Sequence, residues 1–256
     1  MRLYEIPWYV ESADLCHFFH TMELPEVGLV QGLWDLRDTV DDYLGDVDYA
    51  GKRVLDVGSA SGFLTFEMER RGAEVVSFDA IGWEEVPYEG YREQIEARRT
   101  ELARALKLLK NGYWLAHRLH RSKAQVYYGD IYDLPDALGL FDVAVIGTVL
   151  GHLRDPMLAL ESICRRVRQV VVVVEGTFDD ERPVGYFAPD PASGTPTNIW
   201  WSMSESCICQ MLGVFGFGVT ANTAYHLCNN PTPEAIQPAE AKKRSIPVTT
   251  FVGRRK

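Results

Sequence analysis

Apolar and polar positions follow two different patterns along the chain, with the change near Gly51. After Gly51, short apolar runs alternate with stretches whose apolar residues recur at helical spacing, which predicts βαβ units and a mostly parallel sheet. The runs predicted as strands are residues 53–57, 74–78, 124–128, 141–146, 169–174, 218–225 and 247–253. We therefore expect an α/β, doubly wound, mostly parallel seven-stranded sheet.

Helical spacing between these runs predicts the helices that cover the sheet. They are residues 63–71, 91–110, 113–120, 156–167 and 204–215. The pair Asn111-Gly112 predicts a break between the second and third of these helices, because such residues commonly end a helix. Beyond Glu175, four prolines from Pro183 to Pro196 predict a long loop, of the kind that forms lids or binding loops.

Residues 1–50 are rich in aromatic side chains and lack the strand–helix alternation. We expect one or two helices there, ending with residues 36–44, as a helical N-terminal extension or cap. Residues 51–256 would form the main domain, and the two parts together one compact domain. A length of 256 residues and a hydrophobic share of 46% are normal for such a protein.

Charge and residue usage narrow the function. The formal net charge of −10 favours neither nucleic acid nor an anionic membrane surface as a partner. The sequence has no apolar run of membrane-spanning length and no apolar secretory core after its start, so we expect a soluble, cytoplasmic protein. The spacing of the five cysteines fits neither a zinc site nor a redox motif.

The first chemical signal is the segment Val54-Leu55-Asp56-Val57-Gly58-Ser59-Ala60-Ser61-Gly62. A strand that turns through small residues into a helix lets a ligand approach the backbone, and the helix start favours a polar or negative group. By itself this segment fits nicotinamide, flavin and adenosylmethionine binders about equally.

Two acids follow at the ends of the next strands. Asp79 ends the second strand, where a carboxylate accepts hydrogen bonds from both hydroxyls of a ribose; a structural strand-end aspartate is the alternative. Asp130 follows the third strand, where it could accept from an adenine amino group while the backbone N–H of Ile131 donates to the ring. An ordinary Asx turn is the alternative for Asp130.

Together with Phe141–Gly147 as the fourth strand, these features resemble the class I, Rossmann-like S-adenosylmethionine-dependent methyltransferases over about residues 51–256. The resemblance implies S-adenosylmethionine as cofactor, and one departure is Ala60, where the family often has glycine. The implied cofactor-binding residues are Trp34, Asp56, Gly58, Ser59, Gly62, Asp79, Asp130, Ile131 and Gly147.

A finer resemblance includes residues 19–24, 32–35, 148–156 and 198–204, which are similar to the branch that contains the tRNA wobble-uridine carboxymethyltransferase. In that branch the tryptophan that matches Trp34 lies against the cofactor. Two departures concern the carboxylated cofactor of that branch: its lysine aligns with Thr39, and its tyrosine before the histidine is Gly151. The sequence therefore favours ordinary S-adenosylmethionine.

His152 is the candidate general base, because it follows the fourth strand and imidazole has a suitable pKa for accepting a hydroxyl proton. The alternative is a rim residue that packs near the tryptophans. Glu175, at the end of the fifth strand, is the second catalytic candidate. It could orient His152, bind a sugar hydroxyl or ligate a divalent ion, and a plain hydrogen-bonding role is equally compatible with its position.

Aromatic and histidine side chains outside these strands are candidates for binding the acceptor, namely His20, Trp200 and Trp201. A divalent metal is conceivable at Glu175 with Asp179 and Asp180, but a solvated acidic loop is the preferred interpretation, so no metal is predicted. His117 and His120 share a helix face without any other sign of a metal. A homodimer is left open.

The leading hypothesis is a methyltransferase acting on a hydroxyl of a small molecule, such as a sugar or another secondary metabolite, by in-line displacement. The alternatives are an RNA (tRNA) modifying methyltransferase and a non-catalytic, methyltransferase-like binding protein. A nicotinamide enzyme is disfavoured, because the loop Gly58–Gly62 has the form G-x-A-x-G and not G-x-G-x-x-G.

Overall fold

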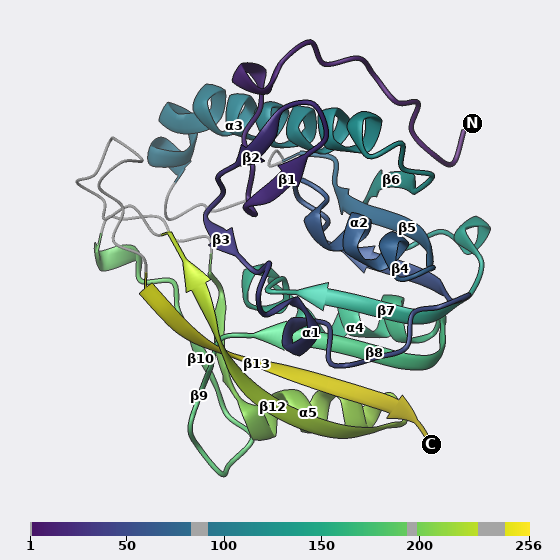
Figure 1. Cartoon of the computed structure of the whole chain (residues 1–256). Helices are drawn as coiled ribbons and strands as arrows, with labels where there is room; N and C mark the ends of the chain where they lie inside the picture. The colour runs from purple at the N-terminus through teal and green to yellow at the C-terminus, as the bar shows by residue number, and fades with distance from the viewer. Residues whose placement is uncertain (1, 83–91, 194–198, 230–243) are drawn as a thin grey trace.

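One large sheet runs through the protein and carries helices on both of its faces (Figure 1). The computed structural model describes residues 2–82, 92–193, 199–229 and 244–256. Within them the sheet has eight strands in the order β3-β12-β13-β8-β7-β4-β5-β6. The parallel strands are β4 (Arg53–Val57), β5 (Glu74–Ala80), β6 (Gln125–Gly129), β7 (Phe141–Gly147) and β8 (Val167–Glu175). The antiparallel pair is β12 (Phe217–Cys228) with β13 (Arg244–Arg255).

The predicted α/β, doubly wound architecture is therefore confirmed, and all seven predicted strands are present. Most of them are a few residues longer than predicted, because backbone pairing continues past the apolar core of each run. The eighth strand, β3 (Trp34–Asp35), pairs with the end of β12. It adds the N-terminal segment to the edge of the sheet.

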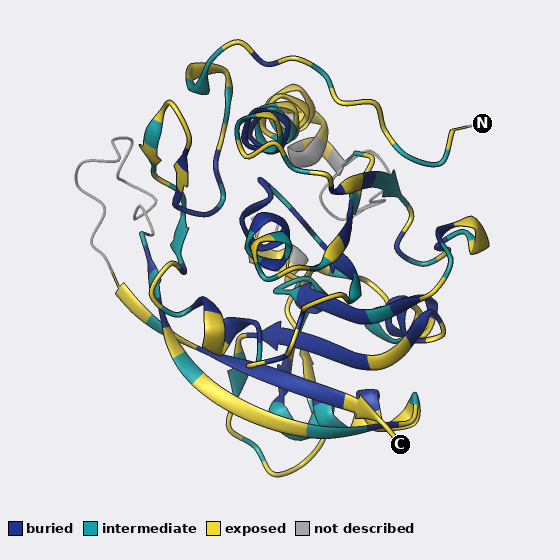
Figure 2. Ribbon diagram, turned by 45° about the vertical axis from the view of Figure 1, so that its right-hand side comes forward, coloured by how far each residue is buried: buried dark blue, intermediate teal, exposed yellow. Residues whose placement is uncertain are grey.

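Alternate residues along each central strand enter two separate hydrophobic cores. The central strands are accordingly buried along most of their length (Figure 2). On one face, Val54 packs in the core that includes α2 (Phe63–Arg70) and α3 (Arg92–Leu119). On the other face, Leu55 packs in the core that includes α4 (Pro156–Cys164) and α5 (Glu205–Val214). Because both faces are covered, the strands are apolar on both sides, as parallel sheets require.

The predicted break at Asn111-Gly112 is wrong, since α3 continues through it to Leu119. Contacts with the N-terminal segment explain both residues. The Asn111 side chain accepts from Nε1 of Trp8 at 3.2 Å and donates to the carbonyl oxygen of Leu15 at 2.9 Å. A Cβ at Gly112 would lie 2.5 Å from the carbonyl oxygen of His17. The glycine serves a close approach between two segments instead of a helix end.

The N-terminal segment contains less helix than predicted. Its only α-helix among the described residues is the single turn α1 (Val40–Tyr43), preceded by a 3-10 turn at Ala13–Leu15. Between them, β1 (Met22–Leu24) and β2 (Gly28–Val30) form an antiparallel hairpin. Burial alternates along β1, which is the pattern of a strand and not of a helix.

The predicted loop after Glu175 also has regular structure. It contains β9 (Thr177–Phe178), β10 (Gly185–Phe187) and a 3-10 turn at Pro191–Ser193. Strands β9 and β10 form a small sheet with β11 (Trp201–Ser204) at its centre. Pro196 and Asn198, the predicted helix start at Tyr91 and most of the connection between β12 and β13 lie outside the described residues.

Candidate cofactor and acceptor site

The predicted site residues meet at one edge of the sheet. Since β4 to β8 are parallel, their carboxyl ends lie at the same edge, which is where ligands bind in open α/β sheets. Gly58, Asp79 and Asp130 belong to the ends of β4, β5 and β6. Gly147 and Glu175 end β7 and β8. Because β12 is antiparallel to β13, which is antiparallel to β8, the end of β12 and its partner Trp34 lie at this edge too.

The corner after β4 is a tight turn held against the end of β5. The N–H groups of Gly58 and Ser59 both donate to the carbonyl oxygen of Phe78, at 2.9 and 3.1 Å. Gly58 has φ of +79°, and a Cβ there would lie only 2.5 Å from Cγ2 of Val149. Ala60, the departure from the family pattern, takes the left-handed conformation with φ of +49°. The turn therefore needs glycine at Gly58 and tolerates alanine at Ala60.

Helix α2 begins directly after this turn. Its first flanking residue, Gly62, has φ of +90° and supplies no side-chain hydrogen bond to the helix. The positive end of the helix dipole and its first N–H groups are thus not capped by a side chain, a feature that suits the carboxylate of a bound amino acid. Oγ of Ser61 accepts from the N–H of Phe19 at 3.0 Å, which attaches the N-terminal segment beside this corner.

Asp79 is half-buried and faces the Gly58–Gly62 turn. Its Oδ2 accepts from the N–H of Ala60 at 2.8 Å, and its Oδ1 accepts from the N–H of Ala80 at 2.7 Å. Burial raises the pKa of Asp79, and the two N–H donors and the Lys110 ammonium oppose that rise. Each oxygen keeps a second lone pair for a donor such as a ribose hydroxyl.

Two neighbours of Asp79 were not predicted from the sequence. Ile81 follows it and is 69% exposed, which is an unusual environment for a large apolar side chain next to a polar turn. Nζ of Lys110 donates to the carbonyl oxygen of Ile81 at 2.8 Å and lies 3.9 Å from the ring centre of Tyr128. Ile81 could have been noticed in the sequence, because it lies two residues after the strand-end acid Asp79. Lys110 could not, because it lies far along α3 and only the fold brings it to this place.

Asp130 is exposed, and its Oδ1 accepts from the N–H of Tyr132 at 2.8 Å. The Asx turn considered as the alternative is thus present, and it uses one carboxylate oxygen. Ile131 is 9% exposed and packs in the core on the α4 side. The structure brings both residues to the predicted edge, directly after β6.

Asp56 lies inside the protein and not at the surface of the corner. It is 1% exposed, and its Oδ2 accepts from Oγ1 of Thr65 at 2.5 Å. Thr65 also bonds Oγ of Ser77 at 2.8 Å, and Ser77 bonds the Tyr113 hydroxyl at 2.7 Å. Burial raises the pKa of Asp56 to about 7. This network ties α2 to β4, β5 and α3, so Asp56 can act on a ligand through the position of α2.

The hydroxyl of Tyr43 lies at the end of β7, a position that the sequence did not predict. A Cβ at Gly147 would lie 2.9 Å from that hydroxyl, and Thr148 hydrogen-bonds it. Trp34 is half-buried, and its backbone N–H donates to the carbonyl oxygen of Phe19 at 3.0 Å. The N-terminal segment therefore reaches the crevice at two points, and nothing in its sequence spacing indicated this for Tyr43.

His152 and Glu175 lie on opposite sides of one short turn. His152 is exposed at the end of the 3-10 turn Leu150–His152. Glu175 is 8% exposed and its Oε1 accepts from the N–H of Gly151 at 3.3 Å, with Val149 and Leu150 as further backbone donors. Burial raises the pKa of Glu175 to about 7. Its carboxyl group therefore holds the turn that presents His152.

The predicted acceptor-binding aromatic residues cover this turn. The N–H of Trp200 donates to the carbonyl oxygen of Gly151 at 2.7 Å, and Nε1 of Trp201 donates to that of Arg154 at 3.1 Å. His20 lies elsewhere, between the rings of Phe19 and Phe63, with centres 5.1 and 5.5 Å away. Its Nδ1 is buried without a partner, and burial lowers its pKa to about 3. His20 is therefore a neutral imidazole beside the start of α2.

No cluster of three or more histidine, cysteine, aspartate or glutamate side chains suited to a metal ion occurs among the described residues. Within the acidic loop considered for a metal, Asp180 pairs with Arg182 at 2.8 Å, and Glu175 is engaged with backbone N–H groups. These contacts agree with a hydrogen-bonding role for Glu175 and with a solvated acidic loop at Asp180.

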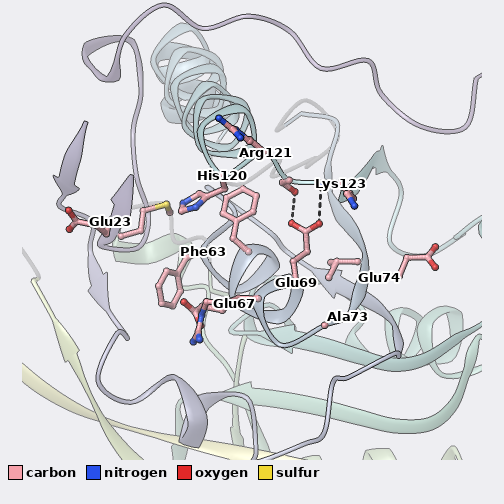
Figure 3. Close-up of a pocket in the computed structure, with 15 residues that line it drawn as sticks. Glu23, Phe63, Glu67, Glu69, Ala73, Glu74, His120, Arg121 and Lys123 are labelled. Carbon is pink, nitrogen blue, oxygen red and sulfur yellow. Dashed lines mark hydrogen bonds and ion pairs between the residues drawn. The ribbon is translucent and has the colours of Figure 1, made fainter. Parts of the chain in front are cut away.

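A cavity of about 640 Å³ lies outside this edge and contains neither Gly58, Asp79 nor Asp130 (Figure 3). It extends along α2 to the start of β5 and the end of α3. Glu69 accepts from Oγ of Ser122 at 2.5 Å and from the N–H of Lys123 at 2.9 Å, and Glu67 pairs with Arg70 at 2.6 Å. These charges are largely satisfied by one another, and they provide no ligand chemistry of their own.

Residues 34–221 match the sequence model of a family described as a methyltransferase domain. The match covers more than half of the chain. The chain belongs to this methyltransferase family. The search of curated proteins found no match.

Solved structures of methyltransferases share its fold. The N-terminal domain of EvdMO1 with SAH bound is 15% identical, covers 95% of this chain and 93% of its own, and has a TM-score of 0.58. Magnesium protoporphyrin IX methyltransferase from Synechocystis with bound SAM is 15% identical, with coverage of 86% and 78% and a TM-score of 0.52. An O-methyltransferase family protein from Burkholderia thailandensis is 12% identical, with coverage of 86% and 56% and a TM-score of 0.54.

In the described part of this methyltransferase, no helix combines the length and apolar character needed to cross a membrane.

Proposed function

We propose that this protein is an S-adenosylmethionine-dependent methyltransferase that methylates a hydroxyl of a small molecule. The observation that carries the proposal is the corner at the end of β4, where a left-handed glycine and the half-buried carboxylate of Asp79 meet. The family match and the fold shared with methyltransferases that bind SAM or SAH support the same cofactor.

The residues at the corner fit an adenosyl amino acid. Gly58, Ser59 and the uncapped start of α2 would hold the methionyl end, and Asp79 would accept from the ribose hydroxyls. Asp130 and Ile131 would border the adenine, and Trp34 and Gly147 would close the methionyl side. When bound, the cofactor supplies an activated methyl group.

The acceptor side rests on His152. Its exposed imidazole stands on a turn held by buried Glu175, at the same edge as the corner. We assign His152 the removal of the acceptor's hydroxyl proton during in-line displacement, and Glu175 the positioning of its turn. Trp200 and Trp201, which cover this turn, are proposed to border the acceptor, whereas His20, buried beside the start of α2, is given no part in that border. A cytoplasmic location, and a small acceptor in place of nucleic acid or membrane, belong to the same proposal.

The second candidate is a tRNA-modifying methyltransferase, supported by the finer resemblance of residues 19–24 and 148–156. Two observations favour the small molecule. The first concerns the cofactor: Thr39 stands where that branch has the lysine for its carboxylated cofactor, and its Oγ1 lies 2.8 Å from Nδ1 of His226, so this chain departs from that branch. The net charge of −10 opposes binding of a phosphate backbone. Salt-dependent binding of tRNA would reverse this preference.

Calorimetry with SAH and labelled S-adenosylmethionine with a panel of hydroxylated metabolites test the proposal. Asp79→Ala should weaken SAH binding by roughly 10- to 100-fold for each charge-assisted hydrogen bond lost. Asp48→Ala is the matched control, because exposed Asp48 also accepts a backbone N–H, that of Ala50 at 3.0 Å, away from the corner. Absence of SAH binding by the unchanged protein, or equal affinities of the two variants, would contradict the proposal.

A further inference from the structure

A second cavity, of about 310 Å³, lies next to the turn that carries His152. Its lining residues are Tyr132, Arg154, Asp155, Phe187 and Trp200. Three of the five are aromatic, and they come from three separate parts of the chain: the end of β6, the turn after β7 and the small sheet. The volume is at the lower end of the range for small-molecule sites.

The walls of this cavity are attached to the segment that follows His152. The hydroxyl of Tyr132 accepts from the N–H groups of Arg154 and Asp155, at 3.1 and 3.2 Å. Trp200 is held through its N–H on the carbonyl oxygen of Gly151 at 2.7 Å. The ring of Phe187 is 5.9 Å from that of Trp200. Aromatic faces and the candidate base therefore belong to one connected unit.

The cavity lining contains one cation, Arg154, and one anion, Asp155. The guanidinium carbon of Arg154 lies 5.7 Å from the ring centre of Trp200, and among the described residues no carboxylate forms an ion pair with Arg154. The only acid in the lining, Asp155, accepts from the N–H of Leu158 at 2.9 Å as the N-cap of α4. The carboxylate of Asp155 is therefore engaged with α4, and the Arg154 guanidinium lies beside an aromatic ring.

Phe187 is 56% exposed, so the cavity carries a large apolar side chain in contact with water. Exposed apolar surface around a cavity is typical of a ligand-binding surface. The Tyr132 hydroxyl and Oδ1 of Asp155 already accept backbone N–H groups, so the aromatic faces and Arg154 are the main features that the cavity offers a ligand. A flat ring with one negative charge matches what the cavity offers.

We infer that this cavity binds the acceptor and that the acceptor is a planar aromatic acid carrying the hydroxyl to be methylated. This inference rests on the proposed function and names its substrate class. The ring lies against Trp200 and Phe187, and the acid group pairs with Arg154. The acceptor oxygen then bonds the methyl carbon as the carbon–sulfur bond of the cofactor breaks, with its electron pair kept by sulfur, and the hydroxyl proton passes to His152.

The probe for this inference is 6-hydroxy-2-naphthoate, with 6-hydroxy-2-naphthamide as its neutral analogue and methyl glucoside as a neutral sugar. Binding of each to the SAH-saturated protein is measured by calorimetry. We expect the naphthoate to bind at least about 10-fold more tightly than the amide, as a charge-assisted hydrogen bond provides. Equal binding of acid and amide, or tighter binding of the glucoside, would overturn the inference.

Arg154→Met should abolish the preference for the acid, whereas Arg168→Met, which removes an exposed arginine from β8, should leave it unchanged. Trp200→Leu should weaken acid and amide by the same factor. A preference retained in Arg154→Met would overturn the inference. Unchanged SAH affinity in each variant shows that it is folded. Failure of the unchanged protein to bind SAH would instead count against the proposed function, so the two failures are separable.

Discussion

The two halves of the carboxyl edge are built in different ways. The cofactor corner is made mostly of backbone, and its position is set by buried groups, among them the Phe78 carbonyl and the Asp56–Thr65 pair. The acceptor side is made of side chains on a short turn and around a small sheet, with His152 and Phe187 exposed and Trp200 half-buried. The corner therefore presents one fixed shape to a constant ligand, while side chains on the other half can vary with the acceptor.

Each half depends on one buried carboxyl group. Asp56 bonds a hydroxyl on α2, and Glu175 bonds the N–H groups of the turn before His152. Neither group faces an open crevice, so both act by holding backbone in place. If this comparison is right, changes in one half should alter cofactor affinity, and changes in the other should alter turnover.

The largest effect is expected for His152→Ala. Loss of a general base should lower kcat by roughly 10²- to 10⁴-fold for whichever acceptor of the panel is turned over. The affinity for SAH should change by less than about twofold, because His152 is not part of the corner. Turnover assays and calorimetry on the same variant check both values. A large loss of SAH affinity with kcat retained would show that the two halves are not separate.

A smaller effect, confined to the cofactor half, is expected for Gly58→Ala. The new Cβ would lie 2.5 Å from Cγ2 of Val149, and overpacking of this kind costs about 1–3 kcal/mol. SAH affinity should fall by roughly 5- to 150-fold. Gly51→Ala is the control, since Gly51 has a similar φ of +67° but no atom within 4 Å of its Cβ position.

A second variant sharpens this result. Val149→Ala removes the atom with which the new Cβ collides, so Gly58→Ala with Val149→Ala should recover much of the lost affinity. Equal losses for Gly51→Ala and Gly58→Ala would mean that backbone strain alone, and not the contact with Val149, explains the effect.

The same difference between the halves decided what the sequence could predict. Gly58, Gly62 and Asp79 are read from a local pattern, because a strand, a tight turn and a strand-end acid are close in sequence and the parallel sheet aligns them. Tyr43 and Lys110 come from outside the pattern. Their contacts with Gly147 and Ile81 depend on how α1 and α3 pack, which periodicity does not specify.

The errors have tertiary causes as well. Asn111-Gly112 predicts a helix end by local preference, but contacts of both residues with the N-terminal segment outweigh it. The β1–β2 hairpin was missed because its strands are only three residues long, too short for an alternating pattern to be distinguished from a helix. Strand β10, in the proline-rich loop after Glu175, was missed for the same reason, since three residues between turns are too few to show a period.

The last effect concerns the response of the two buried carboxyl groups to pH. Burial raises the pKa of Asp56 from 3.8 to about 7, so the unfolded chain releases this proton at lower pH than the folded protein does. The stabilising contribution of the protonated group is complete below about pH 4 and is lost as pH rises to about 7. Asp56→Asn should make the free energy of unfolding fall less steeply across this window, by up to about 1.4 kcal/mol per pH unit.

Urea unfolding at several values between pH 4 and pH 7 measures this slope. Asparagine keeps an oxygen for Thr65, so the hydroxyl bond persists while the titration is removed. Glu175→Gln should flatten the slope in the same direction, because burial raises the pKa of Glu175 from 4.5 to about 7, and exposed Asp48→Asn should leave it unchanged. Additive slopes for Asp56→Asn and Glu175→Gln would show that the two halves are anchored independently. A double variant no flatter than either single one would show that the two anchors titrate as one coupled unit.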